Sequence, residues 1–283
     1  MSLYTLRSIQ LSVMRLTIVA IVVLWLTVVA SAQPSPQLEA GFRDMYNLQF
    51  DVAHAVFHDC ENAHPADPMP PAANAAAYLF AEFDRLHILE SEFFTNDTAY
   101  VTRQKLAPDP ETKRAFLAEL DKSDRLSTAA LAKNADDPNA LFSRIMVFGL
   151  RGDYAALIEK RDMAGLGYIK TGRALAERLL TAHSDYYDAY LAVGVENYLL
   201  GLKPAPMRWF LRITGAQTDR DLGLQKLRIT AEKGHYLLPY ARLLLAVAAL
   251  RDKDTEQAKA LLAGLADEFP SNHLYARELA KLQ

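Results

Sequence analysis

Two histidines one helical turn apart are the residues of this chain with the best spacing for metal chemistry. His54 and His58 occupy positions i and i+4, and Glu61 and His64 follow them. On a helix this spacing brings two imidazoles to one face, where they can share a zinc ion. A zinc protease also needs a glutamate directly after the first histidine, and this sequence has Ala55 there. We therefore expect ordinary helix histidines, with a metal site as the alternative.

Acidic residues between positions 82 and 92 form a second candidate for chemistry. Glu82, Asp84, Glu90 and Glu92 recur at spacings that suit a helix surface. Two carboxylates can act as general acid and general base, yet carboxylates on a helix are far more often a solvated face. We expect a solvated acidic helix over residues 82–92, and an enzyme that uses it is the alternative.

Other catalytic signatures are missing from the sequence. Neither Ser127 nor Ser143 lies in a glycine-flanked nucleophile elbow, and there is no G-x-x-x-x-G-K phosphate loop and no C-x-x-C-H haem motif. The net charge is −3, and the Lys and Arg residues are spread along the chain instead of clustered, which argues against a nucleic-acid partner. We expect a protein that is not an enzyme and binds no cofactor, metal or nucleic acid.

The sequence pattern predicts that these residues lie on α-helices. The chain has 283 residues, and its 51% hydrophobic content suits a folded protein. Apolar residues recur at steps of three and four from Pro34 onward, with breaks at Pro, Asp, Asn and Gly. No segment alternates β-branched residues as a strand would. The pattern predicts one all-α domain over residues 33–283.

Breaks in the periodicity divide this domain into separate helices. Gly152-Asp153-Tyr154 is expected to form a tight turn, with glycine supplying conformational freedom and Asp153 capping the next helix. The long segment that follows contains Gly165 and Gly172, which predicts a bend or close packing. Before position 220, Thr218 or Asp219 is a suitable cap. The segments expected to be helical are 38–46, 51–63, 68–93, 111–133, 139–150, 155–182 and 188–200.

One spacing of side chains occurs twice, near the two ends of the domain. In each copy a small, a large and a medium residue fall on one helical stripe, and a proline follows. The helix before each copy also carries a small residue, Gly41 in the first and Ala246 in the second. The two copies are Ala53, Phe57, Cys60 and Pro65, and Ala258, Leu262, Leu265 and Pro270.

At these positions the chain resembles the tetratricopeptide repeat (TPR), a helical hairpin of about 34 residues. The resemblance implies a TPR-like α-solenoid of antiparallel helix pairs, which binds a peptide or protein partner as a scaffold. Cys60 is the only cysteine, so it forms no disulfide within the chain, and its place in the stripe predicts a packed core residue.

A second resemblance covers the C-terminal half. The chain is similar here to the tetratricopeptide repeat protein 39 family and its bacterial relatives. This resemblance implies a crossover containing prolines and a short helix between two repeats. The family glycine of the turn at 217–220 is absent from this sequence. The segments that carry the resemblance are Asn197–Leu200, Pro204 and Pro206, Leu211–Gly215, Asp219-Arg220 and Gly223–Leu227.

The first 32 residues have the features of a signal peptide. Arg7 and Arg15 precede an apolar run from Leu16 to Ala30, and Ala30-Ser31-Ala32 supplies a small-x-small cleavage site. The run of about 15 residues is short for a membrane-spanning helix, which needs about 20. We expect an exported protein, periplasmic or secreted. The alternative is an uncleaved segment that anchors the chain in the inner membrane, and we expect membrane contact in that case alone.

Aromatic residues concentrate between positions 186 and 210, where we expect most of them to pack between helices. One face of the helix 188–200 combines a carboxylate, two aliphatic side chains and a phenol. In a repeat array such a face lines a concave groove, which would suit a partner segment with a basic residue and apolar anchors. The candidate binding residues are Asp188, Leu191, Val195 and Tyr198.

Overall fold

The structure is a computed structural model, and it describes residues 35–90, 105–202 and 205–283. Throughout these ranges the chain is helical and has no strand, so the all-α prediction is confirmed. Residues 34–283 form one compact unit. The expected signal peptide, residues 1–32, lies outside the described residues.

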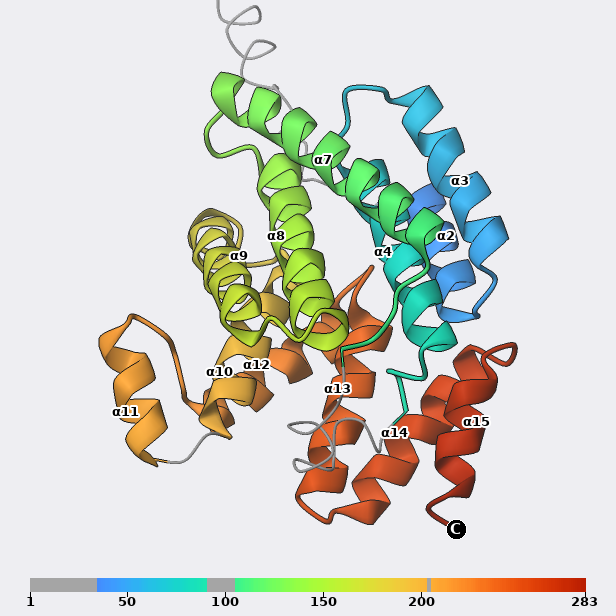
Figure 1. Cartoon of the computed structure of the whole chain (residues 1–283), viewed down its shortest axis with the longest axis vertical. Helices are drawn as coiled ribbons and strands as arrows, with labels where there is room; N and C mark the ends of the chain where they lie inside the picture. The colour runs from blue at the N-terminus through green and yellow to red at the C-terminus, as the bar shows by residue number, and fades with distance from the viewer. Residues whose placement is uncertain (1–34, 91–104, 203–204) are drawn as a thin grey trace, which may run out of the picture. The chain divides into compact units, whose positions relative to one another are not determined.

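Helices follow one another along the described part of the chain (Figure 1). Most consecutive helices pack side by side, α12 packs on α10 instead of α11, and α4 also contacts α2 and α8. The α-helices are α2 (Pro36–Tyr46), α3 (Phe50–Ala63), α4 (Met69–Arg85), α7 (Pro110–Lys133), α8 (Pro138–Asp153), α9 (Asp162–Ala182), α10 (Tyr190–Gly201), α11 (Ala205–Ile213), α12 (Arg220–Lys233), α13 (Leu238–Arg251), α14 (Thr255–Glu268) and α15 (His273–Ala280). A π-helical turn covers Tyr154–Ile158, and a 3₁₀ turn covers Tyr187–Ala189.

Aspartate caps define where several helices begin. The carboxylate of Asp137 accepts a hydrogen bond from the Ala140 N–H at 2.9 Å, at the start of α8. Asp219, one of the two caps expected before position 220, accepts from Leu222 N–H at 3.0 Å. Each cap satisfies an N–H that the first helical turn leaves without a partner. These local hydrogen bonds explain why the starts expected near positions 139 and 220 agree with the observed starts at Pro138 and Arg220, whereas the helix expected from position 155 begins at Asp162.

The two repeated stripes are buried, as predicted. Ala53 and Phe57 in α3 have no exposed surface, and Ala258 and Leu265 in α14 have none either. Gly41 of α2 packs on the Phe57 ring so closely that a Cβ at position 41 would overlap it. The small residue thus allows α2 and α3 to approach, as a helical hairpin of this kind requires.

The expected turn at Gly152 is wrong. Helix α8 continues to Asp153 and runs on into the π-helical turn, and the chain reverses at Lys160, whose φ is 55°. Gly152 instead lies where α8 meets α9, since a Cβ there would lie 3.2 Å from the Ile169 side chain. Gly165 faces it, with a virtual Cβ 3.1 Å from the Gly152 carbonyl oxygen. These glycines therefore serve close helix packing.

The predicted helix over 68–93 is also too long. Helix α4 ends at Arg85, and His87 has a φ of 56°, a left-handed conformation that stops the helix. The expected acidic helix 82–92 is therefore wrong beyond Arg85, and Glu92 lies outside the described residues. Side chains of the acidic stretch do not share one helical face.

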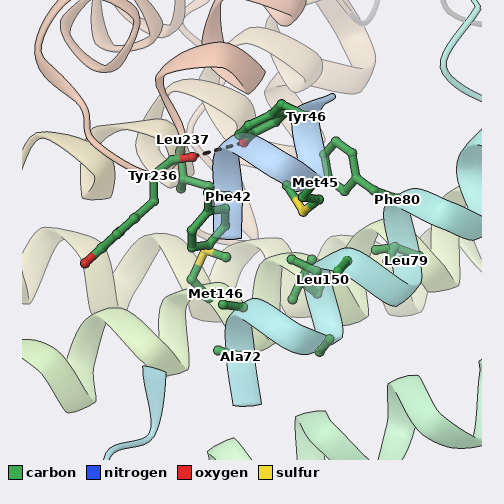
Figure 2. Close-up of a cluster of buried hydrophobic side chains, with 14 of the residues drawn as sticks. Phe42, Met45, Tyr46, Ala72, Leu79, Phe80, Met146, Leu150, Tyr236 and Leu237 are labelled. Atoms are coloured by element: carbon green, nitrogen blue, oxygen red, sulfur yellow. Dashed lines mark hydrogen bonds between the residues drawn. The ribbon is translucent and has the colours of Figure 1, made fainter. Parts of the chain in front are cut away.

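Helix α2 also contacts residues far along the chain. The Tyr46 hydroxyl donates to the carbonyl oxygen of Tyr236 at 3.1 Å, and the Asn272 side-chain amide donates to the Tyr46 carbonyl oxygen at 2.7 Å. Figure 2 shows Phe42 and Tyr46 of α2 packed among Phe80 and residues from α8. In an open solenoid each repeat contacts its neighbours alone. Here α2 is joined to the segments that follow α12 and α14.

Candidate functional site

An apolar pocket of about 170 Å³ lies among α4, α8, α9, α10, α12 and α13. All four candidate binding residues from the sequence line it: Asp188, Leu191, Val195 and Tyr198. Leu191 and Val195 lie one turn apart on α10, and both are half-buried. Aliphatic side chains from the other helices complete the wall. The structure thus brings together the four residues that the helical spacing put on one face.

Asp188 has a different role from the ionic contact expected of it. Its carboxylate accepts hydrogen bonds from the N–H groups of Leu237 at 2.8 Å and His235 at 3.0 Å, and the residue is 2% exposed. Burial raises the pKa of Asp188, whereas these N–H donors act to lower it. Gly234 precedes this contact, and a Cβ there would lie 2.8 Å from the Asp188 carboxylate. Asp188 therefore holds the connection between α12 and α13, which forms one wall of the pocket.

Tyr198 is buried where α10 crosses α12. A Cβ on Gly223 of α12 would overlap the Tyr198 main chain, and a Cβ on Gly194 would lie 2.9 Å from Leu227. Two glycines on opposite helices thus permit main-chain contact at this crossing. The Arg220 guanidinium lies 5.9 Å from the centre of the Tyr198 ring. The crossing sets the position of the pocket wall that Tyr198 and Leu227 share.

Three polar side chains that sequence reasoning missed also line the pocket: Asp153, Tyr240 and Arg251. The Tyr240 hydroxyl donates a long hydrogen bond of 3.5 Å to Asp153. Burial raises the pKa of Asp153 to about 7, and the Tyr240 contact offsets part of that effect. The sequence assigned Asp153 to a turn, so nothing in its pattern indicated a carboxyl group that faces an apolar pocket.

His54 and His58 have separate surroundings. The Nδ1 atom of His54 lies 2.5 Å from Asn74 Oδ1, and its ring stacks on Tyr78 with centroids 4.0 Å apart. Burial lowers the pKa of His54. His58 is exposed, with Nδ1 3.8 Å from the Glu61 carboxylate. Within the described ranges, no three His, Cys, Asp or Glu residues are grouped closely enough to hold a metal ion.

A carboxyl pair, Glu61 and Glu119, lies between α3 and α7. Burial raises the pKa of Glu119 to about 7, and the nearby Glu61 carboxylate adds to the rise. Lys122 forms an ion pair with Glu61. No pattern in the sequence indicates this pair, because the two residues are 58 positions apart and helix packing alone brings them together. Their contact links α3 to α7.

Glu82, from the acidic stretch, has a structural contact. It is 4% exposed, pairs with Arg85 at 2.6 Å and accepts a hydrogen bond from the Asp109 N–H at 2.8 Å. Glu82 thus ties the end of α4 to the start of α7. Glu90 instead pairs with His87 at 3.0 Å and with Arg277 at 3.1 Å. Glu82 and Glu90, which the sequence analysis placed on one acidic helix, therefore have different partners.

Comparisons of the chain with models of known protein families, with curated proteins and with solved structures find no match. None of the helices in the described part of the chain is long and apolar enough to cross a membrane. The geometry of the pocket is therefore the basis for assigning a function.

Proposed function

We propose that this protein is a non-catalytic binding protein that takes an apolar segment of a peptide or protein partner into the pocket beside α10. The observation that carries this proposal is the pocket itself. Its walls are aliphatic side chains from several helices, with a few polar groups among them. Apolar pockets with few convergent polar groups are typical ligand sites, and apolar side chains at helical spacing are typical anchors for them.

The chemistry of the lining favours binding over catalysis. The described residues that form the pocket include no histidine, cysteine, serine or lysine. Of the two carboxyl groups, Asp188 is engaged by main-chain N–H groups, and Asp153 contacts the Tyr240 phenol. The described lining residues therefore offer no Ser–His, Cys–His or lysine nucleophile. The polar groups therefore suit recognition of a partner's polar atom.

We further propose that the helices form a TPR-like solenoid and that the protein acts as a scaffold outside the cytoplasm. The buried stripes of α3 and α14 support the repeat, since both place a small residue at a helix contact. The leader expected over residues 1–32 supports export. A partner would then be a protein or peptide of the cell envelope or its surroundings.

Gly149 allows a direct test of the pocket. It lines the pocket from α8, and a Cβ at this position meets no atom within 4 Å. Gly149→Leu therefore projects a side chain into the pocket. Replacing a glycine inside a helix also improves the helix propensity of α8 by about 1 kcal/mol. We expect the variant to be folded, with a melting temperature no lower than that of the wild type, and to lose peptide binding.

The binding measurement uses random peptides displayed on phage and selected on the immobilised protein. We expect enrichment of peptides with apolar residues at i and i+3 or i+4, on the wild type and not on Gly149→Leu. Gly264→Leu is the matched control, because Gly264 is exposed on α14 and its Cβ also meets no atom within 4 Å. Equal enrichment on all three proteins would show that the pocket is not the binding site.

A further inference from the structure

Helix α11 exposes large apolar side chains on a segment of nine residues. Trp209 is 67% exposed, Ile213 is 64% exposed and Met207 is 51% exposed. In Figure 1, α11 lies beside α10 and away from α2, α3 and α14. Single exposed apolar residues are ordinary, whereas several on one short helix mark an interaction surface. Trp209 is therefore an exception to the expectation that most aromatic residues between positions 186 and 210 pack between helices.

The segment that follows α11 is held in place by buried polar groups. Glu196 has no exposed surface, and its carboxylate accepts a hydrogen bond from the Gln217 N–H at 3.0 Å. Asn197 donates to the Gln217 side chain at 2.7 Å, and Lys170 of α9 donates to the Thr214 carbonyl oxygen at 2.9 Å. Leu211 on the inner side of α11 is 8% exposed. The helix thus presents its apolar face from a fixed attachment.

Charge is distributed around α11 in the manner of an interfacial helix. Arg208 and Arg212 lie one turn apart on one side, and Trp209 and Ile213 lie one turn apart on the next. The sequence between Glu196 and Asp219 contains three basic residues and no acidic one, although the whole chain has a net charge of −3. A local positive charge next to exposed apolar side chains is complementary to an anionic, partly apolar surface.

We propose that α11 docks on the surface of a bilayer that contains anionic lipid. The helix lies in the plane of the interface, with Trp209 and Ile213 among the acyl chains and the two arginines at the phosphate groups. Trp is favoured at this depth because its ring is apolar and its N–H is polar. Anionic headgroups attract each nearby basic residue, and this attraction is screened by salt. This contact is separate from the pocket and from the N-terminal segment.

Tryptophan fluorescence can test the docking at the site itself. The chain has two tryptophans, Trp25 and Trp209, so a full chain carrying Trp25→Phe reports from α11 alone. We expect its emission to shift to the blue with vesicles of equal phosphatidylglycerol and phosphatidylcholine, and to be quenched by brominated acyl chains. Vesicles of phosphatidylcholine alone should leave the emission unchanged. The N-terminal segment cannot mimic this result, because it then contains no tryptophan.

Charge removal gives the second arm of the experiment. The double variant Arg208→Gln/Arg212→Gln should require about tenfold more lipid, or more than that, to reach half of the emission shift. High salt should also weaken the vesicle-dependent shift of the protein that keeps both arginines. Met163→Ser is the matched control, because Met163 is 79% exposed on α9 and lies outside α11. An emission spectrum that anionic vesicles do not change would overturn the proposal. A shift that depends on protein concentration without lipid would also overturn it, since a second copy would then cover this face.

Discussion

Asp188 and Asp153 line the same pocket, and their different partners give them different properties. Asp188 faces two main-chain N–H groups, which can stabilise its ionised form in a buried position. Asp153 has one long contact with a phenol, so little offsets the cost of burying its charge. The protonation of Asp153 therefore changes near neutral pH, where the pocket gains or loses a negative charge.

The stability of the protein should depend on pH through Asp153. Its pKa is raised from 3.8 to about 7 in the folded state. A raised pKa of this kind contributes stability that is complete below the unfolded value and is lost as pH rises through the folded value. Between pH 4 and pH 8 the wild type should lose more unfolding free energy than Asp153→Asn. Urea unfolding at several pH values measures this, and parallel curves for the two proteins would contradict the assignment.

At the scale of elements, small residues decide how closely neighbouring helices approach. Gly41 packs on Phe57, Gly152 faces Gly165, and Gly223 meets the main chain of Tyr198. Each contact removes apolar surface from water while it keeps two helix axes close. Ala258 in α14 belongs to the same class, since it is buried completely at a helix contact.

Enlarging Ala258 should therefore destabilise the fold. Ala258→Leu forces extra side-chain volume into a packed contact, and we expect a loss of about 1 to 3 kcal/mol of unfolding free energy. Ala260, two residues later on the same helix, is exposed and should accept leucine with a change of about 0.5 kcal/mol or less. Denaturant unfolding of both variants tests the register of α14. Equal losses of unfolding free energy in the two variants would show that Ala258 does not lie on the buried face of α14.

For the molecule as a whole, the main feature is that α2 contacts segments far along the chain. Tyr46 joins α2 to Tyr236 before α13 and to Asn272 before α15. Its ring also packs on Phe80 and Phe269, with centroids 5.8 Å and 5.7 Å away. One residue thus contacts helices from both ends of the chain.

Removal of the Tyr46 side chain should lower the local stability of helices far along the chain from α2. We expect Tyr46→Ala to lower hydrogen-exchange protection in α13 and α14 as well as in α2 and α4, since the Tyr46 side chain contacts Phe80 of α4, Tyr236 before α13 and Phe269 after α14. Val52→Ala is a suitable comparison, because Val52 is 51% exposed on the neighbouring helix. If protection fell in α2, α3 and α4 alone, the helices would behave as an open array with nearest-neighbour coupling.

Local patterns in the sequence predict the helical class, most helix boundaries from α2 to α10, the two buried stripes and the four residues of α10 and its 3₁₀ turn that share one face. All of these follow from local rules: side-chain periodicity, proline and glycine placement, and capping by Asp. Thr218 and Asp219 were the two caps expected in this way, and Asp219 is the one that forms. Local rules suffice here because each feature depends on residues within about one helical turn of one another.

The contacts that these residues make with other helices follow from the tertiary structure and not from local sequence. Gly152 looks like a turn residue in sequence, but its neighbour is Gly165 on another helix. In the sequence Asp188 is a carboxylate available to a partner, but in the structure this carboxylate accepts hydrogen bonds from main-chain N–H groups 47 and 49 residues later. Asp153 meets Tyr240, 87 residues away. Burial, a shifted pKa and a pocket all depend on which helices meet in space, and periodicity along one helix carries no information about its partner.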